Sequence, residues 1–239
     1  IGMEFIGTME EDECIYTILD LEQYLGQEIK INTSYNTFEM MIKEHGERCL
    51  PSVMRRYCTD ELKMQIAFEW WQKTCSEVVE MRIGYRANEM YRVKKMQKQF
   101  NEDGLFPFKH IIGSKETKKG KQNIWKTTYW QKPSFPLIEK QPTWKDDIKK
   151  FWKGKPIRFA EFNNCVGCFH REPLLLKYMW QKHPNKMQHF SDFEKDRKYN
   201  NDTFKCDDNV TYERIKNMNL TQKLTANDFS ECDSGYCGM

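Results

Sequence analysis

The side chains best suited to chemistry are cysteines in two closely spaced pairs. Cys165 and Cys168 are two residues apart, so both thiolates could bind one metal ion or cluster from a tight turn in which Gly167 supplies backbone freedom. Cys232 and Cys237 form a second pair. Four sulfur ligands suffice for a zinc site or an iron–sulfur cluster. The alternatives for the first pair are a redox disulfide and reduced thiols.

Cations gather around Cys58, a rival for the fourth ligand position. Arg56 lies just before this cysteine, and Thr59 and Lys63 follow it in the first turns of an expected helix. Helix N-termini attract anions, so this segment predicts a phosphate or sulfate site. The alternative is an exposed basic turn with Thr59 as N-cap. We also expect the cations to lower the pKa of Cys58, which makes it the best placed thiol for nucleophilic attack.

A second charged pair, Arg86 and Glu89, follows an expected strand over residues 78–84. Open α/β sheets bind ligands at the carboxyl ends of their strands, which favours a ligand role for Arg86. An ion pair at the start of a helix is the alternative. No histidine has a metalloprotease or triad context, so we assign no catalytic residue.

Hydrophobic periodicity indicates which elements position these residues. It predicts helices over residues 9–25, 37–45, 59–75, 143–152, 172–183 and 185–199, and strands over residues 28–32, 78–84, 124–130 and 135–138. Strands that alternate with helices predict an α/β fold with a parallel sheet flanked by helices. We expect an α/β domain over 1–160, to which the family resemblance given below assigns nucleotide binding, and a CxxC-containing helical region and tail over 161–239, in which the polar residues after 200 are an appendage.

Residues 101–123 lack periodicity and predict a long basic loop, either simply solvated or a clamp on phosphate groups. This stretch includes Lys115, Lys118, Lys119 and Lys121, and the aromatic residues Trp125, Tyr129 and Trp130 follow. Aromatic rings among cations can stack bases. A non-catalytic, metal-stapled module that grips single-stranded nucleic acid is therefore the alternative function.

Composition limits the choice of function. The 239 residues carry 38 Lys+Arg and 35 Asp+Glu for a net charge of +3, which argues against a dedicated nucleic-acid coat and leaves local basic patches. No apolar run reaches the roughly 18 residues of a membrane helix, so we expect no membrane partner. Nine cysteines, an odd count, and a start without signal-peptide features predict a reducing cytoplasm.

Several segments follow one another in a characteristic order. They are Gly2-Met3-Glu4, Arg56-Tyr57-Cys58-Thr59 with Leu62-Lys63, Gly84-x-Arg86-x-x-Glu89 with Arg92, Pro136-Leu137-Ile138, and Asn164-Cys165-Val166-Gly167-Cys168-Phe169. Together they resemble the phosphoadenosine phosphosulfate reductase family, and more narrowly the reductase-like proteins of bacteria and phages. The resemblance spans roughly Gly2 to Arg171.

The resemblance implies an adenine nucleotide alpha-hydrolase-like, Rossmann-like sheet that binds ATP or adenosine phosphosulfate, and sulfur transfer or reduction supported by a thiol reductant protein. It implies nucleotide-binding roles for Gly2, Glu4, Arg56, Thr59, Lys63, Arg86 and Glu89, and an iron–sulfur cluster or zinc on Cys58, Cys165 and Cys168 with Cys232 or Cys237. The family's Ser-Gly-Gly-x-Asp-Ser phosphate loop has no counterpart in these residues. We therefore expect an N-terminal segment to be missing, which could leave this fragment inactive.

Overall fold

The computed structural model describes residues 9–32, 37–45, 49–75, 77–118, 120–162, 165–196, 203–207, 209–220, 222–225 and 229. The chain forms two compact units: unit 1 comprises Ile1–Leu62 and Gly154–Met239, and unit 2 comprises Lys63–Lys153. Among the described helices, none combines the length and apolar character needed to cross a membrane. The expected domain boundary near residue 160 stays a prediction.

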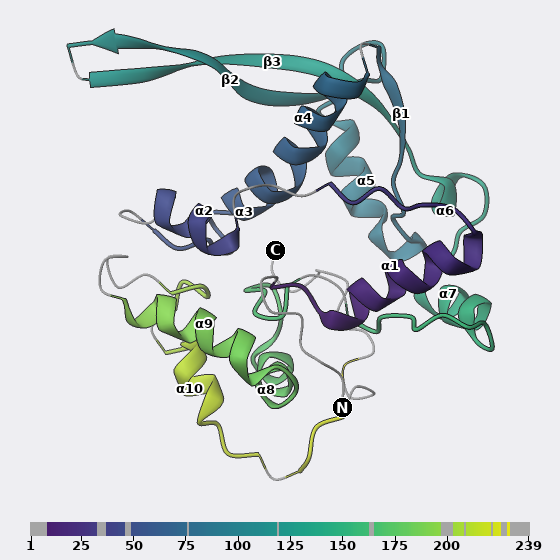
Figure 1. Ribbon diagram of the computed structural model, residues 1–239, viewed down its shortest axis with the longest axis vertical. Coiled ribbons are helices and arrows are strands. Elements are labelled where there is room, and N and C mark those ends of the chain that lie inside the picture. Colours follow the sequence, from purple (N-terminus) through teal and green to yellow (C-terminus); the bar gives the residue numbers. More distant parts are fainter. Residues whose placement is uncertain are drawn as a thin grey trace. The chain divides into compact units, whose positions relative to one another are not determined.

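Unit 2 is an α/β unit built on a three-stranded mixed sheet (Figure 1). Its elements are α4 (Gln65–Thr74), β1 (Val79–Arg82), α5 (Met90–Gln97), β2 (Phe106–Thr117), β3 (Gly120–Ser134), α6 (Pro136–Glu139) and α7 (Lys145–Trp152). The strand order is β1-β3-β2, with β1 parallel and β2 antiparallel to β3. The α/β class is thus confirmed, whereas the described sheet is mixed and not wholly parallel.

The expected basic loop is instead most of a long β-hairpin, so that prediction is wrong. Strands β2 and β3 pair from Phe106 opposite Gln131 to Thr117 opposite Gly120, where Gly120 has a φ of 103°. In Figure 1 the ribbon extends past α4 of the same unit. The outer part of this hairpin has solvent on both faces, so its sequence lacks the alternation that reveals a half-buried strand.

The base of the hairpin is anchored by aromatic side chains of α4. The ring of Phe68, 1% exposed, lies 4.9 Å from the ring of Phe108 and meets Trp130 edge-on at 5.7 Å. Trp71 also contacts Trp130 at 5.5 Å. Trp130 is therefore buried and belongs to the core, not to the base-stacking surface predicted from the sequence.

Two further strand predictions are wrong. Residues 135–138 belong mostly to α6, where Pro136 occupies the first helical position that its fixed φ suits, and Phe135 is buried against the stacked ring of Tyr85. Residues 28–32 form no strand, and the Ile29 N–H donates to the Glu22 carboxylate instead of a neighbouring strand. The strand predicted at 78–84 is confirmed as β1.

Unit 1 is helical in its described part. Its elements are α1 (Asp12–Leu25), α2 (Phe38–His45), α3 (Tyr57–Thr59), and the C-terminal helices α8 (Pro173–Lys182), α9 (Pro184–Lys195) and α10 (Tyr212–Lys216). A π-helical turn over Asp60–Met64 includes the last residues of this segment of unit 1 and the first residues of unit 2. Helix α1 begins at Asp12 and not at residue 9, because Glu10 forms a β-bridge with Cys165. Gly26, with a φ of 62°, ends α1 as expected.

Several described residues after 200 belong to the core of unit 1, contrary to the expected appendage. Phe204 and Tyr212 have no exposed surface, and Ile215 is 1% exposed. They pack with Leu176 of α8 and Phe190 of α9 in one hydrophobic cluster. These apolar residues are isolated among polar residues in the sequence, so the hydrophobic pattern did not predict that they are core residues.

Phe68→Ala should lower the free energy of unfolding of unit 2 by about 3–5 kcal/mol, because it empties the pocket between α4 and the hairpin. The matched change Trp125→Ala, at a ring that is 51% exposed, should cost less than about 1 kcal/mol. Urea denaturation followed by circular dichroism measures both. Equal losses would contradict the assignment of Phe68 to the core.

Candidate functional site

Residues 165–168, here called the cysteine turn, belong to unit 1. Hydrogen bonds join the turn to the residues that follow it and to the segment before α1. The Cys168 N–H donates to the Cys165 carbonyl at 3.1 Å and closes the turn. The Arg171 N–H then donates to the Cys168 carbonyl at 2.9 Å. On the other side, the Val166 N–H donates to the Met9 carbonyl at 2.7 Å. The strand-like segment before α1 therefore fixes the turn from outside.

Beneath the turn lies a buried aromatic cluster of Phe190, Phe204 and Tyr212, here called the aromatic floor. An ideal Cβ on Gly167 would lie only 2.4 Å from the Phe190 ring. The Tyr212 hydroxyl donates to the Gly167 carbonyl at 2.7 Å. Gly167 has no left-handed φ, so the expected reason for this glycine is wrong. It is needed because the backbone lies directly on the Phe190 ring.

The aromatic floor is held by Glu194 of α9. Its two carboxylate oxygens accept the N–H groups of Phe204 at 3.1 Å and Tyr212 at 2.6 Å. The rings of Phe204 and Tyr212 stack at 5.2 Å. Burial raises the pKa of Glu194 to about 7, although both hydrogen bonds favour the charged form.

The structure brings Cys58 close to the cysteine turn, although the two lie far apart in the sequence. Burial raises the pKa of Cys58, and the nearby Cys168 raises it further, while Arg56 offsets only part of this effect. The expected lowering of this pKa is therefore wrong. A hydrogen bond with Cys168, together with burial, raises the pKa of Cys165. Cys58 and Cys165 are therefore protonated at neutral pH.

The thiol groups of these cysteines are suitable donors for a metal. The described residues do not, however, provide enough donors in an arrangement that would hold a metal ion. Soft thiol donors suit zinc or an iron–sulfur cluster. Within the described ranges, no group of three or more His, Cys, Asp or Glu side chains is arranged to hold a metal ion. Cys232 and Cys237, the other expected ligands, lie outside the described residues.

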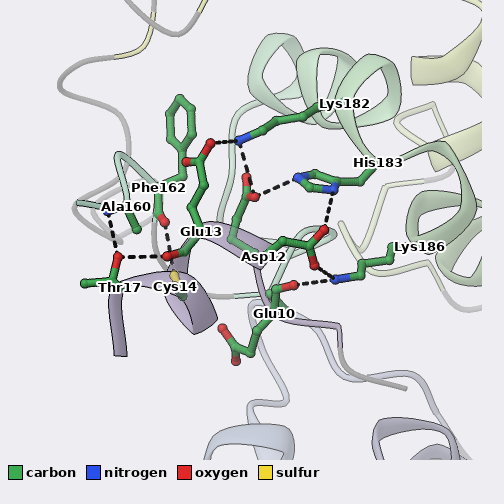
Figure 2. A network of polar contacts seen from close by, with 12 residues as sticks. Glu10, Asp12, Glu13, Cys14, Thr17, Ala160, Phe162, Lys182, His183 and Lys186 are labelled. Atoms are coloured by element: carbon green, nitrogen blue, oxygen red, sulfur yellow. Dashed lines mark hydrogen bonds and ion pairs between the residues drawn. The ribbon is translucent and has the colours of Figure 1, made fainter. Parts of the chain in front are cut away.

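A buried polar network ties the segment before α1 to the junction of α8 and α9 (Figure 2). Glu11 has no exposed surface, and its Oε2 lies 2.6 Å from His183 Nε2. Lys186, which is 4% exposed, donates to the Asp12 carboxylate at 2.6 Å and to the Glu10 carbonyl at 2.8 Å. Lys182 donates to the same Glu11 oxygen at 3.5 Å.

The charge of Glu11 depends on these partners. Burial alone would raise its pKa, but the hydrogen bond and charge of His183, with the charge of Lys182, lower it overall. Glu11 is thus ionised and paired inside the protein.

The sequence did not predict this network, because charged residues at a helix start are usually solvated. The only sequence feature that pointed to it was the position of His183 directly before Pro184, where α9 begins.

The expected nucleotide-binding residues divide between the two units. Arg56, exposed, and Thr59, half-buried, belong to unit 1 beside Cys58. Lys63, Arg86 and Glu89 belong to unit 2, and Lys63 is exposed at its start. Gly2 and Glu4 lie outside the described residues. Each unit therefore contributes its own basic residues to the expected set.

Arg86 and Glu89 form the helix-start ion pair given as the alternative. Arg86 Nε donates to Glu89 Oε2 at 3.0 Å, and Arg92 donates to Glu89 Oε1 at 2.7 Å. Glu89 is 4% exposed. Burial would raise its pKa, but the hydrogen bonds from Arg86 and Arg92 lower it overall. A ligand role for this pair stays a prediction.

Comparisons with family models, with curated proteins and with solved structures gave no match in any of the three. The resemblance to the phosphoadenosine phosphosulfate reductase family therefore stays a prediction from the sequence motifs.

Gly167→Ala should lower the free energy of unfolding of unit 1 by about 1–3 kcal/mol, because the new methyl group overlaps the Phe190 ring. Gly113→Ala is the matched control, since a Cβ there meets nothing within 4 Å and needs no unusual φ. Thermal denaturation of both variants compares them. Equal stability would show that the turn does not lie on the aromatic floor.

Glu194 should make the protein less stable as pH rises. Its pKa is raised from 4.5 to about 7 in the folded protein, so its contribution is full below pH 4.5 and lost as pH rises to about 7. Relative to Glu194→Gln, the natural protein should lose up to about 3 kcal/mol over this window.

For the variant Glu213→Gln, we expect the stability difference from the natural protein to change with pH in the opposite direction. A hydrogen bond from Lys195 lowers the pKa of Glu213, so its contribution should be lost as pH falls. Urea denaturation between about pH 2.5 and pH 8, a range that includes the acidic side of pH 4.5 where Glu213 loses its contribution, gives the stability difference for each variant. A difference for Glu194→Gln that does not change with pH would contradict the buried, raised carboxyl.

Proposed function

We propose that this chain is related to the phosphoadenosine phosphosulfate reductases, binds an adenine (phospho)sulfonucleotide or ATP, and acts in sulfur transfer or reduction. The observation that supports this most is the approach of Cys58 to the turn of Cys165 and Cys168. The resemblance requires these cysteines, from separate segments and in this order, to act together.

The proposed cofactor is an iron–sulfur cluster or zinc on Cys58, Cys165 and Cys168, completed by Cys232 or Cys237. Metal binding would displace protons from the thiols, because only thiolates are good ligands. When bound, zinc would fasten the segments together, whereas a cluster would add an electron-transfer centre. The cysteine turn, held by Gly167 on the aromatic floor, would present its two sulfur atoms in a preset arrangement.

For the substrate, we propose that cations balance the charge of phosphate and sulfate groups. Arg56 and Lys63 are exposed, so anions can reach them. Attack at sulfur or at the α-phosphate develops negative charge, which such cations stabilise. Reduction of a sulfonucleotide requires two electrons, for which we propose a thiol reductant protein. Because burial keeps Cys58 protonated, the attacking nucleophile stays unassigned.

Lys63→Ala and Arg56→Ala should each weaken the binding of ATP or adenosine phosphosulfate by about tenfold or more, the effect of losing one charge-assisted hydrogen bond. Lys73→Ala, an exposed lysine at the end of α4, is the control and should bind normally. Isothermal titration calorimetry measures the three affinities. If all three proteins bind equally, or none binds, the nucleotide site is wrong.

Anaerobically purified protein should contain about one zinc ion, or iron with acid-labile sulfide, per chain. Cys168→Ser should lose most of it, whereas Cys206→Ser, at an exposed thiol, should retain it. Elemental analysis and sulfide determination give both contents. Metal-free protein, or equal contents in the two variants, would remove the cofactor from the proposal.

A further inference from the structure

We propose that one face of the β2–β3 hairpin binds single-stranded nucleic acid. This inference concerns unit 2 alone and does not depend on the function proposed above. Its first basis is charge. The described lysines of the hairpin are Lys109, Lys115, Lys118, Lys121, Lys126 and Lys132, against one acidic residue, Glu116. A hairpin with this excess of cations attracts a polyanion, whereas an apolar protein partner would need fewer charges.

The register of the hairpin separates its two faces. Side chains alternate along each strand, and Phe108 and His110 lie on the face that Phe68 of α4 covers, with ring distances of 4.9 Å and 4.6 Å. The His110 ring nitrogen also meets the Thr128 hydroxyl at 3.0 Å, which places Thr128 on the same face. This covered face has no room for a ligand at the hairpin base.

The opposite face, here called the outer face, comprises Lys109, Ile111, Trp125, Thr127 and Tyr129. Lys109 is paired with Thr127 and Ile111 with Trp125, and Tyr129 lies two positions after Thr127 along β3. The Lys109 ammonium lies 5.3 Å from the centre of the Trp125 ring, which confirms that both side chains are on this face. The structure thus sets a cation between two aromatic side chains.

The aromatic side chains of the outer face are available to a ligand. Trp125 is 51% exposed and Tyr129 is 43% exposed, and Ile111 of β2, opposite Trp125, is 49% exposed. Exposed rings beside cations are the arrangement that stacks unpaired bases while the ammonium groups contact phosphates. Trp130, which the sequence also suggested, is excluded from this role because it is buried.

The rings also favour a single strand over a duplex. A two-stranded ribbon fits the major groove of DNA, and there it would read base edges with polar side chains. Trp125 and Tyr129 can instead offer flat faces, which only unstacked bases can use. Because stacking tolerates every base, we expect little sequence preference, and lysine contacts should make the affinity strongly salt-dependent.

The test uses the full chain and fluorescein-labelled oligo-dT and oligo-U, with fluorescence anisotropy as the readout. Trp125→Ala and Tyr129→Ala should each weaken binding by about five- to 100-fold, the range for one lost base stack. Trp144→Ala is the matched control, because that ring is 54% exposed on the same unit but lies at the start of α7. It should bind like the natural protein. Trp125→Phe, which keeps a ring, should restore most of the affinity.

Lysine variants test the charge separately. Lys109→Gln and Lys121→Gln should each reduce the salt dependence of binding by about 0.7 in log–log slope, the value for one single-strand phosphate contact. Lys98→Gln, an exposed lysine after α5, should leave the slope unchanged. Circular dichroism melting verifies that each variant is folded.

Three results would overturn the inference: no binding of the labelled strands, equal losses for Trp125→Ala and Trp144→Ala, or equally tight binding of a duplex of the same length. Binding of ATP or adenosine phosphosulfate should not change in the hairpin variants. Failure of the nucleotide experiment with intact oligonucleotide binding would therefore refute the proposed function alone, and the converse result would refute only the hairpin site.

Discussion

The contact between the Gly167 backbone and the Phe190 ring is the constraint on which unit 1 depends most. It lets the cysteine turn lie directly on the aromatic floor, and any larger residue would have to push the two apart. The Tyr212 hydroxyl fastens the same peptide from below. The position of both thiols is therefore set by packing within the core and not by the four residues of the turn alone.

A second support acts through charge. The network of Glu11 and Asp12 with Lys182, His183 and Lys186 holds the segment before α1 against the junction of α8 and α9. Buried charges are unfavourable unless they are paired, so each member relies on the others. Because the same segment bonds to Cys165 and Val166, the network also positions the cysteine turn. Residues distant from the cysteines in the sequence thus help to determine where the thiols lie.

Unit 2 divides its aromatic residues between structure and surface. Phe68, Trp71 and Trp130 form the anchor that holds the hairpin on α4, whereas Trp125 and Tyr129 lie on the exposed face. Strand β3 contributes to both sets, since Trp125 and Tyr129 lie on one face and Trp130 lies on the other, beside a shift in register. The stability of the base allows the outer part of the hairpin to carry exposed rings and lysines.

The sequence by itself determined the helices with strong periodicity, including α1, α8 and α9, and the strand β1, because these depend on neighbouring residues. It offered the pairing of Arg86 with Glu89 at a helix start only as an alternative to a ligand role. Its cysteine spacing also indicated the turn. Only the tertiary structure decided that residues 101–123 belong to a hairpin, that Phe204 and Tyr212 are core residues, and that Cys58 approaches Cys168 with a raised pKa. These features depend on contacts between segments that are distant in the chain and on the burial that those contacts cause. The pattern of neighbouring residues cannot predict such contacts.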